Sequence, residues 1–318
     1  WSLKDLDDYE IVERSPTTTI YKGMKFVSAS PPSSGGLALS QMLNMLSFYE
    51  FDKMNQAARI HLFAEIMRRA YRDRAEFLGD PDFIEVPVDR LTSSIYTSKL
   101  IRSIKRGTAT SSSTLKPVAE PTGRGTDTTH FSIVDKDGNR VAATLSINYP
   151  FGSGFVAEGT GVLLNDEMDD FSAKPGEPNI YGLVGGEANA IEPGERMLSS
   201  MSPSFVETGD RVAILGTPGG SRIITMVLLA ALDFHQGANA EQMVKQGRFH
   251  HQYLPDRIIY EPGVIDDKVK SKLLKLGHAL EELEGEYGNM QVVIMDKKSK
   301  KSEAASDPRG SGKATVIH

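Results

Sequence analysis

The spacing of apolar residues divides the first part of the chain into two short strands and a series of helices. Alternating runs at residues 19–21 and 25–27 predict strands. Apolar residues at helical spacing predict helices from about residue 37 to 46, over residues 55–78 and over residues 88–106. On the helix at 55–78 the side opposite the apolar stripe carries a charged set: Arg68, Arg69, Arg72, Asp73 and Arg74. The first part of the chain is therefore predicted to be mostly helical.

The pattern changes near residue 128. Residues 108–126 are rich in Ser, Thr, Pro and Gly and have no apolar periodicity, so they predict a linker. A hairpin follows, with strands at 129–134 and 140–147 that meet at Asp135-Lys136-Asp137-Gly138. The remaining predicted elements are strands at 204–207 and 211–215, an apolar helix at 223–234, helices at 240–246 and 266–276, and a strand at 291–296. This contrast divides the chain into regions 1–127 and 128–318.

Composition narrows the possible functions. A chain of 318 residues with ordinary apolar and charged fractions can form a large globular core. Its net charge of -6 disfavours nucleic-acid and anionic-membrane partners, because there is no basic excess to neutralise phosphates. The absence of cysteine excludes thiol catalysis, disulfides and thiolate metal sites. The apolar stretch at 223–234 is too short to span a bilayer, so we expect no transmembrane segment.

Thr128 lies where the predicted linker becomes a strand. A hydroxyl residue at such a junction suggests self-cleavage of the Asp127-Thr128 bond. Cleavage would free the α-amino group of Thr128, which can then act as the general base for its own Oγ. The alternative is structural, because β-branched residues are common at the start of strands.

Three further segments offer groups for chemistry, each with a structural alternative. Gly219-Gly220 lies between a strand and a helix. Its backbone N–H groups could bind an oxyanion, or the glycines could only permit a tight turn. No Gly-Lys-Ser/Thr follows it, so a nucleotide-binding loop is disfavoured. The acids Glu167, Asp169 and Asp170 could bind a substrate ammonium, or they could simply belong to a solvated loop. The hydroxyls of Ser199-Ser200 could bind a carboxylate, or the pair could be part of an ordinary loop.

Adjacent histidines at 250 and 251 resemble a metal site only superficially. Neighbouring residues on one strand or helix point apart, and no carboxylate has ligand spacing to them. We interpret these two histidines as structural and expect no metal ion.

In their order along the chain, several motifs resemble those of the γ-glutamyltransferases (γ-glutamyltranspeptidases) of the N-terminal-nucleophile hydrolase superfamily. The motifs are Pro31-Pro32-Ser33-Ser34-Gly35-Gly36, Gly79-Asp80-Pro81, Thr128-Thr129-His130, NDEMDDFSAK at 165–174, LSSMSP at 198–203, PGGSR at 218–222 and Ser306-Asp307-Pro308-Arg309. The resemblance runs through essentially the whole chain. It implies an α+β fold, a four-layer αββα sandwich built from a precursor that cuts itself into a large and a small subunit. Region 1–127 would then be the C-terminal portion of the large subunit, and region 128–318 the small, catalytic subunit.

The resemblance also implies a role for each site residue. Thr128 would be both the cleaving residue and the catalytic nucleophile. Ser146 would support it in place of a threonine that is common in the family. The amino side of the γ-glutamyl group would be bound by Asn148, Glu167 and Asp170, and its α-carboxylate by Ser199 and Ser200. The oxyanion would be bound by Gly219 and Gly220, and the loop around Tyr181 would form a lid.

The implied reaction is acyl transfer from glutathione or a related γ-glutamyl amide to water, an amino acid or a peptide, with no cofactor. A periplasmic or secreted location is implied by the family alone. The chain is expected to lack the front part of the large subunit, which in the family supplies an arginine for the substrate carboxylate. Two alternatives stay open: a related acylase that acts on glutaryl or cephalosporin-type side chains, and an uncut, catalytically inert form.

Overall fold

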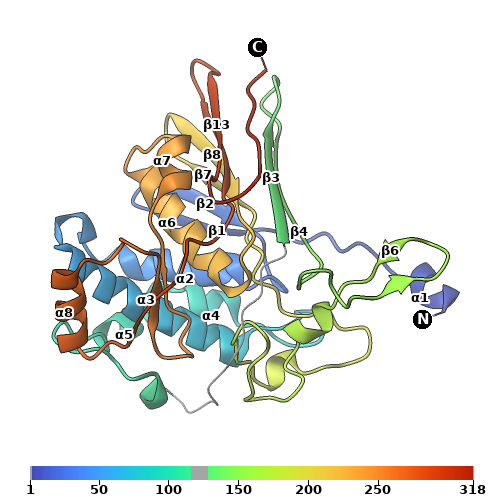
Figure 1. Ribbon diagram of the computed structural model, residues 1–318, viewed down its shortest axis with the longest axis horizontal. Coiled ribbons are helices and arrows are strands. Elements are labelled where there is room, and N and C mark those ends of the chain that lie inside the picture. Colours follow the sequence, from blue (N-terminus) through green and yellow to red (C-terminus); the bar gives the residue numbers. More distant parts are fainter. Residues whose placement is uncertain (1, 116–127, 318) are drawn as a thin grey trace.

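The structure is a computed structural model that describes residues 2–115 and 128–317 (Figure 1). Most of the predicted linker, and Asp127 on the upstream side of the predicted cleavage position, lie outside the described residues.

The helices are α1 (Leu3–Asp7), α2 (Gly35–Leu46), α3 (Gln56–Phe77), α4 (Val88–Thr92), α5 (Ser94–Arg102), α6 (Ile223–His235), α7 (Ala240–Lys245) and α8 (Asp267–Lys275). The strands are β1 (Thr17–Tyr21), β2 (Met24–Ser28), β3 (Thr128–Val134), β4 (Arg140–Ser146), β5 (Val156–Ala157), β6 (Val162–Leu163), β7 (Ser204–Glu207), β8 (Arg211–Gly216), β9 (Phe249–His250), β10 (Ile258–Tyr260), β11 (Leu280–Glu282), β12 (Gln291–Asp296) and β13 (Ser302–Ser306). Short 3-10 turns include η2 (Ser112–Leu115), η3 (Glu167–Asp170) and η5 (Gly220–Arg222).

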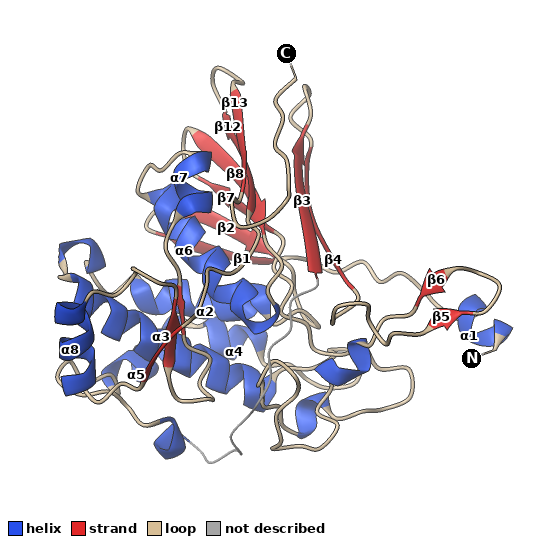
Figure 2. Ribbon diagram, viewed as in Figure 1, coloured by secondary structure: helices blue, strands red, loops and turns tan. Residues whose placement is uncertain are grey.

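The main sheet joins segments from both sides of Thr128. Its described strands run in the order β1-β2-β7-β8-β12-β13, and all neighbours are antiparallel. Helices α2, α6 and α7 contact this sheet, and the β3–β4 hairpin packs against β8 and β12 from the other side (Figure 2). Helices, main sheet and hairpin therefore form successive layers.

The hairpin exposes an apolar outer face. In β3 and β4 the outward-pointing residues include Phe131, Ile133, Val141 and Leu145, each more than 40% exposed. The inward-pointing His130 is buried, and its ring lies against the backbone of Gly216 in β8. Side-chain alternation along β3 thus gives the hairpin a polar face toward the main sheet and an apolar face away from it.

The double glycine of the 31–36 motif belongs to helix α2, which begins earlier than predicted. A Cβ on Gly35 would lie 1.9 Å from Ser202 Oγ, and one on Gly36 would lie 2.2 Å from the carbonyl oxygen of Ala29. These glycines are therefore required by the close approach of neighbouring segments to the first turn of the helix.

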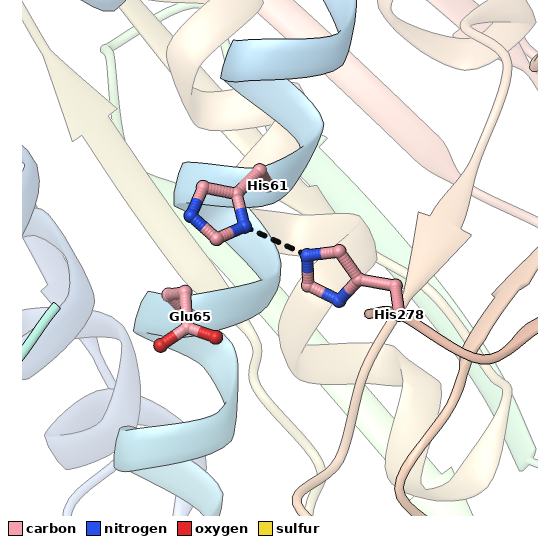
Figure 3. Close-up of side chains that lie close together, drawn as sticks. All are labelled: His61, Glu65 and His278. Atoms are coloured by element: carbon pink, nitrogen blue, oxygen red, sulfur yellow. Dashed lines mark hydrogen bonds between the residues drawn. The ribbon is translucent and has the colours of Figure 1, made fainter. Parts of the chain in front are cut away.

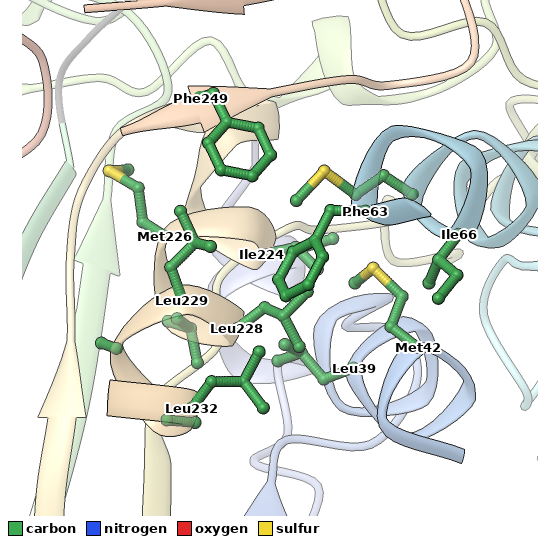
Figure 4. Close-up of a cluster of buried hydrophobic side chains, with 14 of the residues drawn as sticks. Leu39, Met42, Phe63, Ile66, Ile224, Met226, Leu228, Leu229, Leu232 and Phe249 are labelled. Carbon is green, nitrogen blue, oxygen red and sulfur yellow. The ribbon is translucent and has the colours of Figure 1, made fainter. Parts of the chain in front are cut away.

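The core lies where helices α2, α3 and α6 meet (Figure 4). Leu39, Phe63 and Leu228, one from each helix, belong to a single cluster of buried side chains. The prediction of a buried apolar helix at 223–234 is confirmed by α6, whose residues from Ile223 to Leu232 are all buried. Burial of this apolar surface is the main term that holds the helical layer together.

The charged side of helix α3 is mostly buried, which the apolar stripe alone did not indicate. Arg68, Arg69, Asp73 and Arg74 are each at most 4% exposed. Arg68 and Arg69 share the carboxylate of Glu65, and Arg68 also pairs with Asp256 at 2.9 Å. Charges can be buried when they are paired and hydrogen-bonded. The partner of Arg68 comes from a segment almost two hundred residues away, so its burial was not visible locally.

Two other predictions need correction. The helix predicted over residues 88–106 is broken at Ser93, whose backbone is extended and whose side chain caps the next helix by accepting from the Tyr96 N–H. The linker predicted from residue 108 is instead packed on the body as far as residue 115. The Thr110 N–H donates to Glu65 Oε1 at 2.9 Å, and the Ser112 N–H donates to Asp256 Oδ2 at 2.7 Å.

Shortening Leu228 tests the position of the core. Leu228→Ala should lower the free energy of unfolding by about 2–5 kcal/mol, because it removes buried methyl groups and leaves a cavity. Leu3→Ala, at a position 81% exposed, is the matched control and should leave that free energy nearly unchanged. Urea denaturation measures both variants, and equal effects would contradict the assignment of the core.

Candidate active site

Most of the residues singled out in the sequence line one small cavity of about 20 Å³. Its lining consists of Thr128, Ser146, Asn148, Glu167, Asp170, Tyr181, Leu183, Ser199, Ser200, Met201, Gly220, Ser221 and Ile223. Gly219 is not part of the lining, although its neighbour Gly220 is. The cavity therefore gathers hydroxyls, carboxylates and a glycine turn from segments that are far apart in the chain. The cavity has room for about one water molecule.

Thr128 starts strand β3 directly opposite Ser146, the last residue of β4. The two hydroxyl oxygens are 3.1 Å apart. Ser146 Oγ also accepts a hydrogen bond of 2.8 Å from the Asn148 N–H. The hairpin register thus places a second, anchored hydroxyl against the side chain of Thr128, where it can exchange a proton or a hydrogen bond with it.

Two carboxylates from η3 form the acidic side of the cavity. Burial raises the pKa of Asp170 to about 7, the negative charge of Glu167 adds to the rise, and the positive charge of Arg74 opposes it. Burial also raises the pKa of Glu167, and a hydrogen bond from Ser146 offsets part of that rise. Glu167 Oε1 is buried without a hydrogen-bond partner among the described residues. A desolvated acid pair with an unused oxygen is suited to bind a cationic group.

The serine pair is fixed by the segment before helix α2. The Ser34 N–H and hydroxyl both donate to the carbonyl oxygen of Ser199, each at 2.7 Å, and the Ser199 N–H donates to the carbonyl oxygen of Pro32. Ser199 Oγ accepts from the Met201 N–H at 3.0 Å, and Ser200 Oγ accepts from the Arg74 guanidinium at 3.4 Å. Because each hydroxyl oxygen accepts from within the protein, its proton is available to an anion in the cavity.

The diglycine forms a tight turn between β8 and α6. Gly219 has φ 141° and Gly220 has φ 56°, which disfavour residues with a side chain. A Cβ on Gly220 would lie 2.4 Å from the ring of Tyr181. The turn thus needs glycine for its backbone and for the approach of the tyrosine. Its role as an oxyanion site stays a prediction.

Tyr181 closes one side of the cavity. Its hydroxyl donates to the carbonyl oxygen of Asn148 at 2.5 Å, and its own carbonyl oxygen accepts from Gln252 Nε2 at 3.0 Å. Gln252 Oε1 in turn accepts from Ser221 Oγ at 2.7 Å. The tyrosine loop is therefore held to both the hairpin and the glycine turn. Enlarging the cavity on this side would require the tyrosine loop to move.

Sequence reasoning missed several residues that support the site. Arg74, Ser34, Ser221 and Gln252 were not proposed as site residues, yet each is hydrogen-bonded to a residue of the cavity lining or is itself part of that lining. Their residue types carry no local signal of function. Only the presence of Ser34 and Ser221 within the quoted motifs pointed toward them.

A separate buried cluster has the composition of a metal site but not its chemistry. His61, Glu65 and His278 lie close together (Figure 3). However, both oxygens of Glu65 are held by Arg68, Arg69 and Thr110. His61 Nδ1 lies 2.7 Å from His278 Nε2, and His61 Nε2 lies 2.8 Å from the carbonyl oxygen of Lys105. A divalent cation would face two guanidinium groups, so we interpret the cluster as a hydrogen-bonded polar core.

The adjacent histidines are each hydrogen-bonded within the protein. His250 is bonded to Thr225 Oγ1 and Gln252 Oε1, both at 2.8 Å. His251 lies against Arg68 and Asp256. Burial lowers the pKa of His251 to about 4, so the ring is neutral near pH 7. This arrangement agrees with the structural interpretation of the pair.

Comparisons with known proteins agree with the sequence resemblance. The family model described as gamma-glutamyltranspeptidase matches residues 1–317. A glutathione hydrolase proenzyme of Pseudomonas aeruginosa is 45% identical over 324 residues, which cover 99% of this chain and 57% of that protein. The chain thus spans little more than half the length of that relative.

Solved structures support the fold. A gamma-glutamyltranspeptidase from Pseudomonas nitroreducens, complexed with L-DON, is 49% identical with a TM-score of 0.55, over 60% of this chain and all of that one. A cephalosporin acylase from Bacillus halodurans aligns over 100% of this chain and 56% of its own, with a TM-score of 0.83 at 22% identity. The predicted α+β fold of the N-terminal-nucleophile type is confirmed. In the described part of the chain no helix is long and apolar enough to cross a membrane.

The raised pKa of Asp170 predicts a pH-dependent stability difference. Between its ordinary value of 3.8 and about 7, the folded protein holds a proton on this group that the unfolded chain has lost. The contribution of Asp170 to stability therefore falls as the pH rises through this window. The Asp170→Asn variant has no ionisable group at this position and does not lose this contribution. Its free energy of unfolding, relative to that of wild type, should therefore increase between pH 5 and 7 by up to about 1.4 kcal/mol per pH unit.

Urea denaturation of both proteins at several pH values provides the measurement. The raised pKa of Asp233, also about 7 because of burial, is common to both proteins and cancels in the difference. A stability difference that does not change with pH would show that Asp170 titrates normally.

Proposed function

The chain belongs to the γ-glutamyltranspeptidase family, and from this premise we propose that it transfers and hydrolyses γ-glutamyl groups of glutathione or related γ-glutamyl amides through Thr128. The observation that carries the proposal is the shared cavity, in which the Thr128 hydroxyl meets an acid pair, a serine pair and the glycine turn. These groups match the reactive carbonyl, the ammonium and the carboxylate of a γ-glutamyl donor.

The proposed activation begins with the chain itself. Thr128 Oγ attacks the carbonyl carbon of residue 127, and the acyl group moves from the nitrogen to the oxygen of Thr128. This shift breaks the amide bond and frees the α-amine of Thr128, and water then hydrolyses the ester to a carboxyl group on residue 127 and the Thr128 hydroxyl. The word proenzyme in the name of the Pseudomonas aeruginosa relative supports a precursor that matures by cleavage into two subunits.

In the proposed turnover the α-amine accepts the proton of Thr128 Oγ as the oxygen attacks the γ-carbonyl carbon. The N–H groups of the Gly219-Gly220 turn stabilise the oxyanion. The intermediate collapses to a γ-glutamyl ester as the leaving amine takes the proton. Water or an amino-acid or peptide amine then attacks the ester and restores Thr128. This ping-pong chemistry requires no cofactor. Ser146 supports the nucleophile through its 3.1 Å contact with Thr128 Oγ1.

Substrate recognition follows the polarity of the cavity. Glu167, Asp170 and Asn148 are proposed to hold the α-ammonium of the donor, and Ser199 and Ser200 its α-carboxylate. Tyr181 is proposed as the lid, because it covers the turn and the closed cavity holds only about one water. A periplasmic or secreted location is proposed from family membership alone.

The glutaryl or cephalosporin-type acylase is the second candidate. A glutaryl donor lacks the amino group, so it would leave the buried acids Glu167 and Asp170 without their cationic partner, which is unfavourable. Comparing γ-glutamyl and glutaryl anilides as donors separates the two activities. Faster turnover of the glutaryl compound would favour the acylase.

Thr128→Ala should abolish both maturation and turnover, because it removes the attacking oxygen of each reaction. Denaturing electrophoresis and release of the anilide chromophore measure the two effects. Thr129→Ala, the adjacent exposed threonine, is the matched control and should mature and turn over normally. Cleavage of the Thr128→Ala chain into two pieces would assign the nucleophile to another residue.

Asp170→Ala should raise the KM for γ-glutamyl donors roughly 10- to 100-fold, the cost of losing one hydrogen bond between charged groups. Glutaryl donors, which have no ammonium, should be much less affected. In the wild-type enzyme the KM for γ-glutamyl donors should rise as the pH falls below about 7, because Asp170 becomes protonated and neutral. Glu177→Ala, an exposed acid on the neighbouring loop, is the control. Unchanged donor kinetics would remove Asp170 from the site.

A further inference from the structure

Arg74 is a buried arginine without an ion-pair partner among the described residues. It lies on helix α3 behind the cavity and is only 4% exposed. The neighbouring arginines on the same helix all have a carboxylate partner: Arg68 and Arg69 pair with Glu65, and Arg72 pairs with Asp73. The negative charge of Asp170 acts on the Arg74 guanidinium from beyond ion-pair distance, and a buried charge also needs hydrogen-bond partners close to it.

The guanidinium of Arg74 contacts the serine pair by two routes. Its Nε donates to Ser34 Oγ at 2.9 Å, and the Ser34 hydroxyl donates onward to the carbonyl oxygen of Ser199 at 2.7 Å. A terminal nitrogen of Arg74 reaches Ser200 Oγ at 3.4 Å. One cation therefore fixes the backbone of Ser199 and the hydroxyl of Ser200, both of which line the cavity.

The direction of these hydrogen bonds is suited to an anion. An arginine can only donate, so the Ser200 oxygen must accept from it, and the Ser200 proton is free to point into the cavity. The charge of the guanidinium also polarises the hydroxyl and strengthens it as a donor. The acids Glu167 and Asp170 make the other side of the cavity negative, whereas Arg74 is the cation behind the serine side.

We propose that Arg74 is a positioning residue of the donor site, which orients Ser200 and, through Ser34, Ser199, and adds positive charge behind the hydroxyls that bind the donor α-carboxylate. This proposal rests on the proposed γ-glutamyl chemistry. The carboxylate would then be held by serine hydroxyls, with the arginine one layer behind them.

Donors that each lack one group of the γ-glutamyl moiety test this assignment. The γ-glutamyl p-nitroanilide carries both charged groups. The glutaryl p-nitroanilide carries only the carboxylate, and the 4-aminobutanoyl p-nitroanilide carries only the ammonium. Arg74→Gln should lower kcat/KM for the first two donors by roughly 10- to 100-fold, mainly through KM, and should leave the third nearly unchanged. A loss limited to the two donors that carry an ammonium would show that Arg74 acts on Asp170 instead, and would overturn the proposal.

A double-mutant cycle tests the route through Ser200. If Arg74 acts through this hydroxyl, the losses of Arg74→Gln and Ser200→Ala should be clearly less than additive for the γ-glutamyl donor. Additive losses would refute the positioning role. Arg74→Lys keeps the charge but not the planar fork, so it should recover part of the activity, and it also provides a second variant if Arg74→Gln does not fold.

Controls separate this inference from stability and from the proposed function. Arg69→Gln, at an equally buried arginine of the same helix, should lower the melting temperature without changing the preference among the three donors. Absence of γ-glutamyl turnover in the wild-type chain would contradict the proposed function itself. Calorimetric binding of L-glutamine, glutaramate and 4-aminobutyramide, the amides that match the three anilides, to wild type and Arg74→Gln then decides the role of Arg74. Equal weakening of all three ligands, or of none, would overturn it.

Discussion

The pairing of Thr128 with Ser146 at the end of the β3–β4 hairpin is the constraint on which the site depends. Side chains alternate along a strand, so a shift of one residue would turn Thr128 to the exposed apolar face and bring Thr129 to the cavity. The register is fixed by His130, which is buried against Gly216 and bonded to Thr144 at 2.8 Å. Desolvation lowers the pKa of His130 to about 4, so it packs between the layers as a neutral ring. Packing between the hairpin and the main sheet thus decides which hydroxyl faces the cavity.

The cavity is electrically asymmetric, and this asymmetry follows from which segments supply each side. The η3 turn contributes two acids that burial makes reluctant to ionise. Helix α3 contributes Arg74 from behind the serine pair. A zwitterionic ligand with an ammonium and a carboxylate on one carbon complements both sides at once. In the proposed donor site, a ligand that lacks either group would lose one of these two interactions, which would favour donors that carry both.

The same helix anchors segments that are distant in the chain. Arg68, Arg69 and Glu65 form a buried ionic cluster that also holds Thr110 and Asp256, so segments distant in the chain are fixed to α3. On the other side of the cavity, Gln252 connects the Tyr181 loop to Ser221 at the start of α6. Enlarging the cavity beside Tyr181 would require its loop to move against these bonds. The rest of the site can stay in place, because its supports lie in the core and in the main sheet.

The sequence by itself determined the elements whose pattern is local. The β3–β4 hairpin, the long helix α3 and the buried helix α6 were predicted. Most of the polar residues that line the cavity with Thr128 were named as well, through motifs that occur in family order. The tertiary structure alone decided that the charged side of α3 is buried, that the helix predicted over residues 88–106 breaks at Ser93, and that Arg74 lies behind the serine pair. The reason is physical. Apolar periodicity indicates which side of an element is exposed to solvent. The burial of a charged side chain also depends on partners such as Asp256 and Ser200, which lie next to it only in the folded chain.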